Sequence, residues 1–353
     1  MTHIKDIRQK VQLTEHTVFN VNSTNFPGTY TDFDDVWSQE RFEERFQIDI
    51  ISLSETDMEF DMVGVDAAIA NAIRRILLAE IPTMAIESVA IWNNTSIIQD
   101  EVLAHRLGLI PIKADARLFE YKQKDAEEPT SEDTLQFTLK IKCTRNNVSS
   151  DATDPNVLYK NHRVYTKHME WVPLPGQEHL KAKEIRPVHE DILITTMRPG
   201  HELLMDLYCV KGIGKDHAKF SPVATASYRL LPEIRLLREF YGEEAELLQK
   251  SFSPGVIKLV ETSDGQKMAK VANARLDTCS RNVFRHDELK DDVSLLRVRD
   301  HFIFSVESTG ILPPDVLVSE AIKTLMGKCQ KFLLELDSTS IGKGKHKKGG
   351  KKA

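Results

Sequence analysis

One C-terminal segment constrains the fold of this chain more than any other. After Pro313 and Pro314 the sequence predicts a long helix, because proline is tolerated in the first turn of a helix and poorly inside one. Apolar residues then recur at spacings of 4, 3, 4, 3 and 4, which aligns them along one side of that helix. Such a stripe must pack on the chain's own sheet or against a partner helix. It comprises Val318, Ile322, Leu325, Cys329, Phe332 and Leu336.

A second amphipathic helix is predicted from about residue 67 to residue 81. Asp66 stands where a helix N-cap belongs, and Pro82 ends the pattern. One face is apolar, and the other places a leucine between two arginines. This second face is either a contact surface for a partner or an ordinary surface with one exposed leucine. The apolar face holds Ile69, Ile73, Ile76 and Leu77, and the other face holds Asn71, Arg74, Arg75 and Leu78.

Other segments show strand patterns or none. Residues 46–50 and 58–62 alternate apolar and polar side chains, which predicts a hairpin of two half-buried strands. Residues 301–306 alternate too, and this pattern turns Phe302, Phe304 and Val306 inward. Residues 83–225 mix strand-like segments with loops rich in Pro, Asp and Asn, whereas residues 1–45 are read as an extended arm lying on a surface.

The net charge of −6 hides an asymmetry between the body of the chain and its end. Residues 342–353 contribute six lysines and no acid, which leaves 41 basic and 53 acidic residues for the rest. A body this acidic is unsuited to gripping nucleic acid over a broad surface, because phosphates require Lys and Arg. The lysine-rich end is read as a disordered tail for solubility, nuclear targeting or weak nucleic-acid contact.

The glycine-containing segment Val210–Lys215 does not fit a phosphate-binding loop. Gly212 and Gly214 are too closely spaced for that pattern, and Asp216 replaces the hydroxyl that would hold magnesium. The sequence also lacks a nucleophile elbow, a dinucleotide-binding fingerprint and the kinase motifs. These observations indicate an interaction protein rather than an enzyme.

Metal sites and membrane spans are not expected either. The cysteines are too far apart for a zinc or iron–sulfur motif, and the histidines lack the paired spacing of metal-binding helices. The longest apolar runs fall far short of the about 20 residues that cross a membrane. We therefore expect no cofactor and no membrane association. The cysteines are Cys143, Cys209, Cys279 and Cys329.

Three segments in order resemble the alpha and alpha-like subunits of multisubunit RNA polymerases. Residues 71–78 read NAIRRILL, similar to the hallmark of the first interface helix of that family. Residues 105–111 read HRLGLIP and residues 211–222 read KGIGKDHAKFSP, similar to segments of the archaeal and eukaryotic members. The resemblance covers the chain from about residue 46 to residue 336.

Two further segments point to one branch of this family. Residues 28–37 read GTYTDFDDVW and residues 298–301 read VRDH, which resemble the larger alpha-like subunits shared by eukaryotic polymerases I and III. The polymerase II counterpart carries a cysteine-bound zinc, and some archaeal relatives hold an iron–sulfur cluster. This sequence lacks the paired cysteines for either, so those features do not carry over.

The resemblance implies an α+β fold with a discontinuous, alpha-type dimerisation domain. Residues 46–82 and 226–337 would form that domain from an antiparallel sheet and two long interface helices. A β-rich insert domain would interrupt it at residues 83–225. Residues 1–45 would be the N-terminal arm and residues 338–353 the disordered tail.

The resemblance also implies a non-catalytic scaffold of polymerases I and III, nuclear and enriched in the nucleolus, acting in rRNA, 5S rRNA and tRNA transcription. It would pair with a smaller alpha-like subunit and dock the largest, second-largest and small polymerase subunits, with DNA or RNA contact indirect at most. The alternative is an accessory protein that binds nucleic acid through the lysine tail and a strip of Lys211, Lys215 and Lys219. The expected partner interface is Ile69, Ile73, Ile76, Leu77, Val318, Ile322, Leu325, Cys329, Phe332 and Leu336, and the expected large-subunit docking residues are Asn71, Arg74, Arg75, His105 and Arg106.

Overall fold

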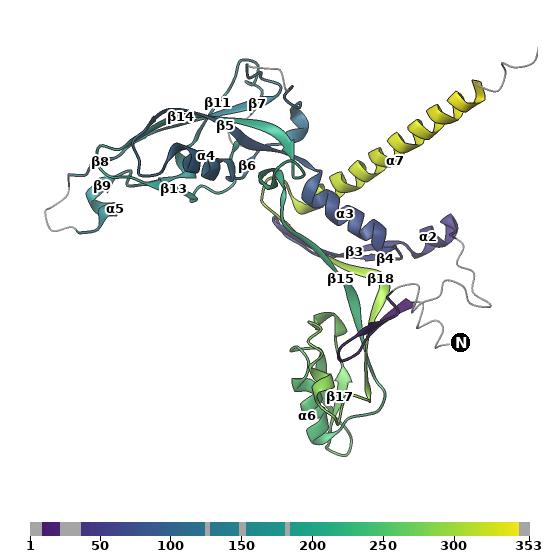
Figure 1. Cartoon of the computed structure of the whole chain (residues 1–353). Helices are drawn as coiled ribbons and strands as arrows, with labels where there is room; N and C mark the ends of the chain where they lie inside the picture. The colour runs from purple at the N-terminus through teal and green to yellow at the C-terminus, as the bar shows by residue number, and fades with distance from the viewer. Residues whose placement is uncertain (1–8, 22–36, 124–127, 148–152, 181–183, 346–353) are drawn as a thin grey trace, which may run out of the picture. The chain divides into compact units, whose positions relative to one another are not determined.

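The computed structural model describes residues 9–21, 37–123, 128–147, 153–180 and 184–345, with side chains described as far as Ser338 (Figure 1). The chain forms two compact units, and both are discontinuous in sequence. The first unit consists of Met1–Ser52, Glu59–Asn71 and Ser227–Ser305, and the second consists of Leu53–Met58, Ala72–Ala226 and Val306–Ala353.

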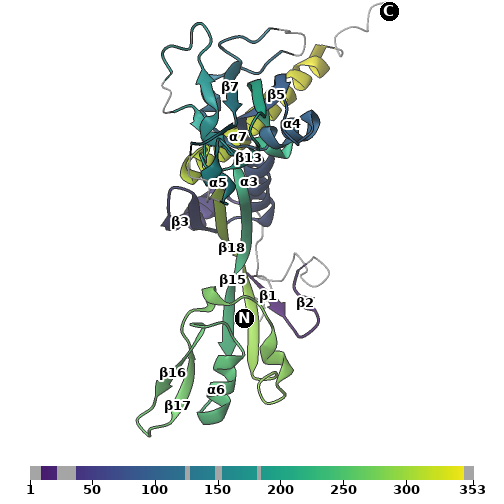
Figure 2. The same cartoon turned by 90° about the vertical axis from the view of Figure 1, so that its left-hand side faces the viewer.

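The first unit is built on a six-stranded sheet. Its strands follow the order β2-β1-β18-β4-β3, and β15 pairs with β18 outside this path. Helix α6 contacts a separate two-stranded ribbon of β16 and β17, as Figure 2 shows. The elements are β1 Lys10–Leu13, β2 Val18–Phe19, α2 Gln39–Arg45, β3 Gln47–Leu53, β4 Asp57–Val63, β15 Val223–Leu236, α6 Gly242–Lys250, β16 Ile257–Glu261, β17 Lys267–Val271, η4 Ala274–Leu276, η5 Asn282–Arg285 and β18 Val293–Ser308.

The hairpin and the inward aromatic residues expected from the sequence are confirmed. Strands β3 and β4 are neighbours in the sheet. Phe302, Phe304 and Val306 are buried, and the Phe304 ring stacks on Phe60 of β4 with 4.9 Å between ring centroids. The alternation at residues 301–306 therefore marks side chains that are buried in a core.

Strand β3 and the N-terminal segment differ from the expectation. The first strand of the hairpin was expected to be half-buried, yet all seven residues of β3 are exposed, because β3 is the edge strand of the sheet. Residues 1–45 were expected to be extended, yet α2 is a helix and β1 is paired with β18. The Ser38 side chain accepts a hydrogen bond from the backbone of Arg41 and so caps α2. Residues 1–8 and 22–36 of this segment lie outside the described residues.

The second unit contains a four-stranded antiparallel sheet in the order β11-β7-β14-β5. Helix α4 contacts β5, and its Leu103 and Leu107 are buried in the same core as Leu139 of β7 and Leu207 of β14. The elements are α3 Ala67–Ala79, which begins in the first unit, β5 Pro82–Asn94, α4 Asp100–Gly108, β6 Ile112–Lys113, η1 Ala116–Leu118, β7 Thr134–Lys142, β8 Thr144–Arg145, α5 Pro155–Leu158, β9 Tyr159–Lys160, β10 Arg163–Tyr165, η2 Thr166–His168, β11 Glu170–Val172, β12 Arg186–Pro187, β13 Leu193–Thr196, β14 Glu202–Ile213, η3 Ala218–Phe220 and α7 Pro314–Lys345.

The two long helices begin where the sequence predicted. Asp66 Oδ1 accepts a hydrogen bond of 2.8 Å from the backbone of Ala68, which confirms Asp66 as the N-cap of α3. Helix α7 starts at Pro314 but extends to Lys345, beyond the expected end near Leu336. The first part of the expected tail is therefore helical, and residues 346–353 lie outside the described residues.

The expected limits of the insert match the two units only in part. The division between Ala226 and Ser227 lies next to the expected limit at residue 225. Helix α7 and the later part of α3, expected in the dimerisation domain, fall in the second unit with residues 83–225. The domain limits stay a prediction.

A charged network lies in the first unit. Arg275 donates hydrogen bonds to Asp61 (Nη1 to Oδ2, 2.7 Å) and to Glu59 (Nη2 to Oε1, 2.5 Å), and His301 Nε2 lies 2.9 Å from Asp61 Oδ2. Burial alone would raise the pKa of Asp61, but the hydrogen bonds from Arg275 and His301 outweigh it and hold the pKa below 3.8.

This network predicts a stability loss in acid. A carboxyl group whose folded pKa is lowered stabilises the protein above its unfolded pKa and loses that effect as the pH falls through the folded pKa. Asp61→Asn should lower the free energy of unfolding of the first unit by about 1.5–3 kcal/mol at pH 7, because charged hydrogen bonds are lost. The difference between wild type and variant, measured by urea denaturation, should shrink below pH 3.8. An equal difference at pH 7 and pH 3 would contradict this assignment.

Candidate functional site

The apolar stripe of α7 passes from the interior of the chain to its surface. Val318 is buried at the start of the stripe, and Ile322 and Leu325 are half-buried. Every described residue from Met326 to Ser338 is exposed, and Phe332 is 62% exposed. The chain therefore covers only the beginning of its own stripe.

The structure sorts the expected partner interface into covered and accessible residues. Ile73, Ile76 and Leu77 of α3 and Val318 of α7 are at most 7% exposed, so the chain itself covers most of their surface. Their place in a partner interface stays a prediction. The accessible members are Ile69, Ile322, Leu325, Cys329, Phe332 and Leu336.

Two surface residues of the stripe were missed from the sequence. Met326 and Leu333 are exposed apolar residues of α7, each four positions after a member of the stripe. Residues four apart on a helix are neighbours, so these two side chains widen the stripe on one side. The apolar face is therefore broader than a strict heptad seam, and the signal lay in this second row of apolar positions.

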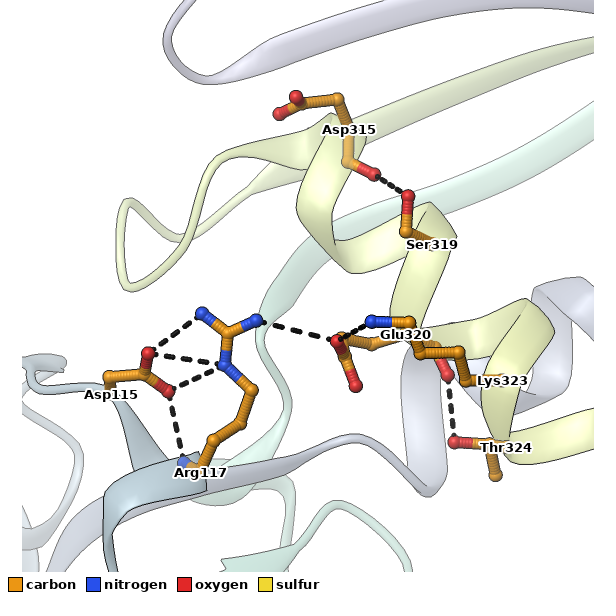
Figure 3. A network of polar contacts seen from close by, with 7 residues as sticks. All are labelled: Asp115, Arg117, Asp315, Ser319, Glu320, Lys323 and Thr324. Atoms are coloured by element: carbon orange, nitrogen blue, oxygen red, sulfur yellow. Dashed lines mark hydrogen bonds and ion pairs between the residues drawn. The ribbon is translucent and has the colours of Figure 1, made fainter. Parts of the chain in front are cut away.

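A polar network attaches the first turns of α7 to the rest of the second unit (Figure 3). Arg117 of η1 donates to Asp115 (Nη2 to Oδ2, 2.7 Å) and reaches Glu320 of α7 (Nη1 to Oε1, 3.4 Å). Lys323 donates to the same Glu320 oxygen at 2.8 Å. The hydrogen bonds from Arg117 outweigh burial and lower the pKa of Asp115, which keeps this carboxylate charged.

The glycine-containing segment holds the end of α3 rather than a phosphate. The backbone of Lys215 donates a hydrogen bond of 2.8 Å to the carbonyl of Ala79, the last residue of α3. A Cβ at Gly214 would lie 2.2 Å from the carbonyl oxygen of Leu78, and a Cβ at Gly212 would lie 2.6 Å from the ring of Phe220. Both glycines are thus required for close packing.

Helix α7 also contacts the end of α3 directly. Lys328 Nζ donates a hydrogen bond of 2.5 Å to Glu80, the residue after the end of α3. Together with the Lys215 contact, this ion pair fixes the C-terminal end of α3 within the second unit. The exposed part of α7 therefore begins where the helix is attached to the end of α3.

The expected large-subunit docking residues come from two separate helices. Asn71 and Arg74 are half-buried and Arg75 is exposed on α3. His105 and Arg106 are exposed on α4, which confirms that the HRLGLIP segment begins in a helix. All five side chains are at least partly accessible to solvent.

The alternative interpretation assigns nucleic-acid binding to a strip of three lysines. Two of these lysines make contacts within the chain. Lys211 Nζ donates to the carbonyl of Phe119 at 2.7 Å and lies over the Tyr121 ring. Lys219 Nζ donates to the carbonyl of Ile86 at 2.8 Å and forms an ion pair with Glu87. These cations serve the fold of the second unit.

The described part of the chain offers neither a cluster of metal ligands nor a membrane-spanning helix. It holds no group of three His, Cys, Asp or Glu side chains that could bind a metal ion, and all four cysteines are free. Among the helices described there, none is both long and apolar enough to cross a membrane.

Similarity to known proteins decides the family. A family model described as the RNA polymerase Rpb3/Rpb11 dimerisation domain matches residues 59–329. The chain belongs to this family. The match includes α3, the glycine-containing segment and α7 as far as Cys329.

Individual relatives agree with the branch expected from the sequence. The chain is 63% identical over 340 residues to "DNA-directed RNA polymerases I and III subunit RPAC1" of Mus musculus, with 96% of this chain and 98% of the relative covered. The subunit of the same name from Saccharomyces cerevisiae is 44% identical, covering 89% and 94%. A "DNA-directed RNA polymerase II subunit rpb3" of Dictyostelium discoideum is 29% identical, covering 80% and 92%. Similarity is therefore higher to these polymerase I and III subunits.

The close approach at Gly214 predicts a specific stability defect. Gly214→Ala should lower the free energy of unfolding by about 1–3 kcal/mol, because the added Cβ must displace the end of α3. Gly327→Ala is the matched control. Apart from the neighbouring backbone of α7 itself, no described atom lies within 4 Å of a Cβ there, so alanine should stabilise α7 by about 0.5–1 kcal/mol. Thermal unfolding midpoints measure both changes, and a neutral Gly214→Ala would contradict the packing role.

Proposed function

We propose that this chain is the larger alpha-like subunit shared by RNA polymerases I and III and that it acts as a non-catalytic assembly subunit. The names of the relatives and the dimerisation-domain match support this assignment. The observation that carries it is the exposed apolar face of α7, which a chain acting alone would leave in water. Exposed apolar surface of this extent is typical of a subunit interface.

The proposed partner is a smaller alpha-like subunit that packs on α7. Phe332 and Leu336 lie on the exposed part of the stripe, and Leu325 marks the point where it leaves the core. Burying these side chains against a partner helix would remove them from water, at about 25 cal/mol for each Å² of apolar surface. In this proposal residues 46–82 and 226–337 form the dimerisation domain around the insert.

Phe332→Asp tests the partner interface. The variant should fail to co-purify the smaller alpha-like subunit, because a carboxylate at the centre of an apolar interface costs about 2–4 kcal/mol of binding free energy. Ser338→Asp adds the same carboxylate away from the stripe and should retain the partner. Co-expression followed by affinity purification measures both. Full recovery of the partner by Phe332→Asp would reject the interface.

The residues proposed to dock the large polymerase subunits are Asn71, Arg74, Arg75, His105 and Arg106. Arginine side chains can make paired hydrogen bonds to carboxylates or carbonyls of a partner. Nuclear localisation follows from membership of polymerases I and III, and enrichment in the nucleolus is proposed from the role in rRNA synthesis. DNA and RNA contacts would be indirect, since Lys211 and Lys219 are engaged within the chain.

Arg75→Ala tests the docking role. Arg75 is exposed, so its removal should leave the fold and the pairing with the smaller subunit unchanged. Recovery of the second-largest subunit should fall about tenfold, which corresponds to about 1.4 kcal/mol. Arg145→Ala, at another exposed arginine of the second unit, is the control. Loss of the smaller subunit from Arg75→Ala would instead place Arg75 in the pair interface.

A further inference from the structure

The end of α4 presents an exposed leucine between two hollows. Leu109 directly follows α4 and is 51% exposed. It contributes to the lining of a hollow of about 220 Å³ on one side and of a second hollow of about 200 Å³ on the other. Leu109 is therefore an accessible apolar side chain that lines both hollows.

The larger hollow is apolar apart from one cation at its edge. Buried Ile110 and Ile194 lie at its base. Arg106 lines the same hollow and is held there by a hydrogen bond of 2.8 Å from Nη2 to the carbonyl of Leu193. The remaining lining comes from Leu109, Ile192 and Leu193.

No opposite charge pairs with Arg106 among the described residues. Within the part of the chain that the structure describes, Arg106 forms no ion pair, and its guanidinium keeps further donors for another acceptor. The second hollow differs, because its cation Lys219 already pairs with Glu87. The larger hollow is therefore complementary to an apolar group with an anion beside it.

We propose that this hollow binds a segment of a large catalytic polymerase subunit that carries an aromatic or long aliphatic side chain next to a carboxylate. This inference rests on the proposed function and specifies the chemistry of the docking contact on α4. A dry cavity of about 150 Å³ accepts benzene, so the hollow has room for one such side chain. The carboxylate would receive paired hydrogen bonds from Arg106.

Site-specific photo-crosslinking of the full-length chain in the assembled polymerase tests the contact. Benzoylphenylalanine at Leu109 should capture one peptide of a large subunit in which Phe, Tyr, Trp, Leu, Ile or Met adjoins Asp or Glu. The matched control carries benzoylphenylalanine at Leu118, which is 65% exposed in the same unit and outside the hollow, and it should not capture that peptide. Capture of a small subunit, or of a peptide without a carboxylate, at Leu109 would overturn the proposal.

A charge exchange tests the role of Arg106 independently. Arg106→Glu should reduce recovery of the captured large subunit at least about tenfold, because it places two carboxylates together. Arg145→Glu makes the same charge change at an exposed arginine elsewhere in the unit and should have no effect. A large subunit in which the captured acidic residue is replaced by Arg should be recovered by the Arg106→Glu chain. The wild-type chain should not recover that altered subunit.

The outcomes separate this inference from the proposed function. If Arg106→Glu retains the large subunit while Arg75→Ala loses it, the hollow proposal fails and the polymerase assignment stands. If the wild-type chain recovers no polymerase subunit, both fail. Equal thermal unfolding midpoints of Arg106→Glu and the wild type would establish that the variant is folded.

Discussion

The hydrophobic effect on α7 is the constraint on which the rest of this structure depends. The first turns of the helix are buried by their own chain, with Leu317 and Ala321 fully covered, while Phe332 and Leu336 lie in water. Each exposed apolar side chain forgoes about 1.5–3 kcal/mol that burial would supply. The exposed part of the stripe would gain stability from a second surface, which is the basis of the proposed interface.

Ion pairs within the second unit fix the part of α7 from which the exposed stripe continues. Arg117 connects η1 to Glu320 of α7 (Figure 3). Lys328 connects α7 to Glu80 at the end of α3. Each ion pair is partly exposed and contributes little alone, in the range of about 0–1 kcal/mol. Together with the Lys215 contact to Ala79, they hold α7 and the end of α3 in place where the exposed part of α7 begins.

Local signals were readable from the sequence, and features set by distant contacts were not. Asp66 and Pro82 marked the limits of α3 because capping and proline sterics are local. The exposure of β3 could not be read, because alternation does not reveal that a strand lies at the edge of a sheet. The burial of Val318 depended likewise on residues far away in sequence. Met326 and Leu333 could have been found, had the stripe been tested beyond the heptad positions.

The motifs that carry the family resemblance divide their residues between folding and recognition. In HRLGLIP, Leu107 and Ile110 enter the core while Arg106 and Leu109 remain at the surface. In KGIGK both glycines serve close packing. Packing within the chain therefore explains the glycines of KGIGK. It does not explain why Arg106 and Leu109 of HRLGLIP remain at the surface. This difference places the candidate docking chemistry on α4 and assigns the glycine-containing segment to support of α3.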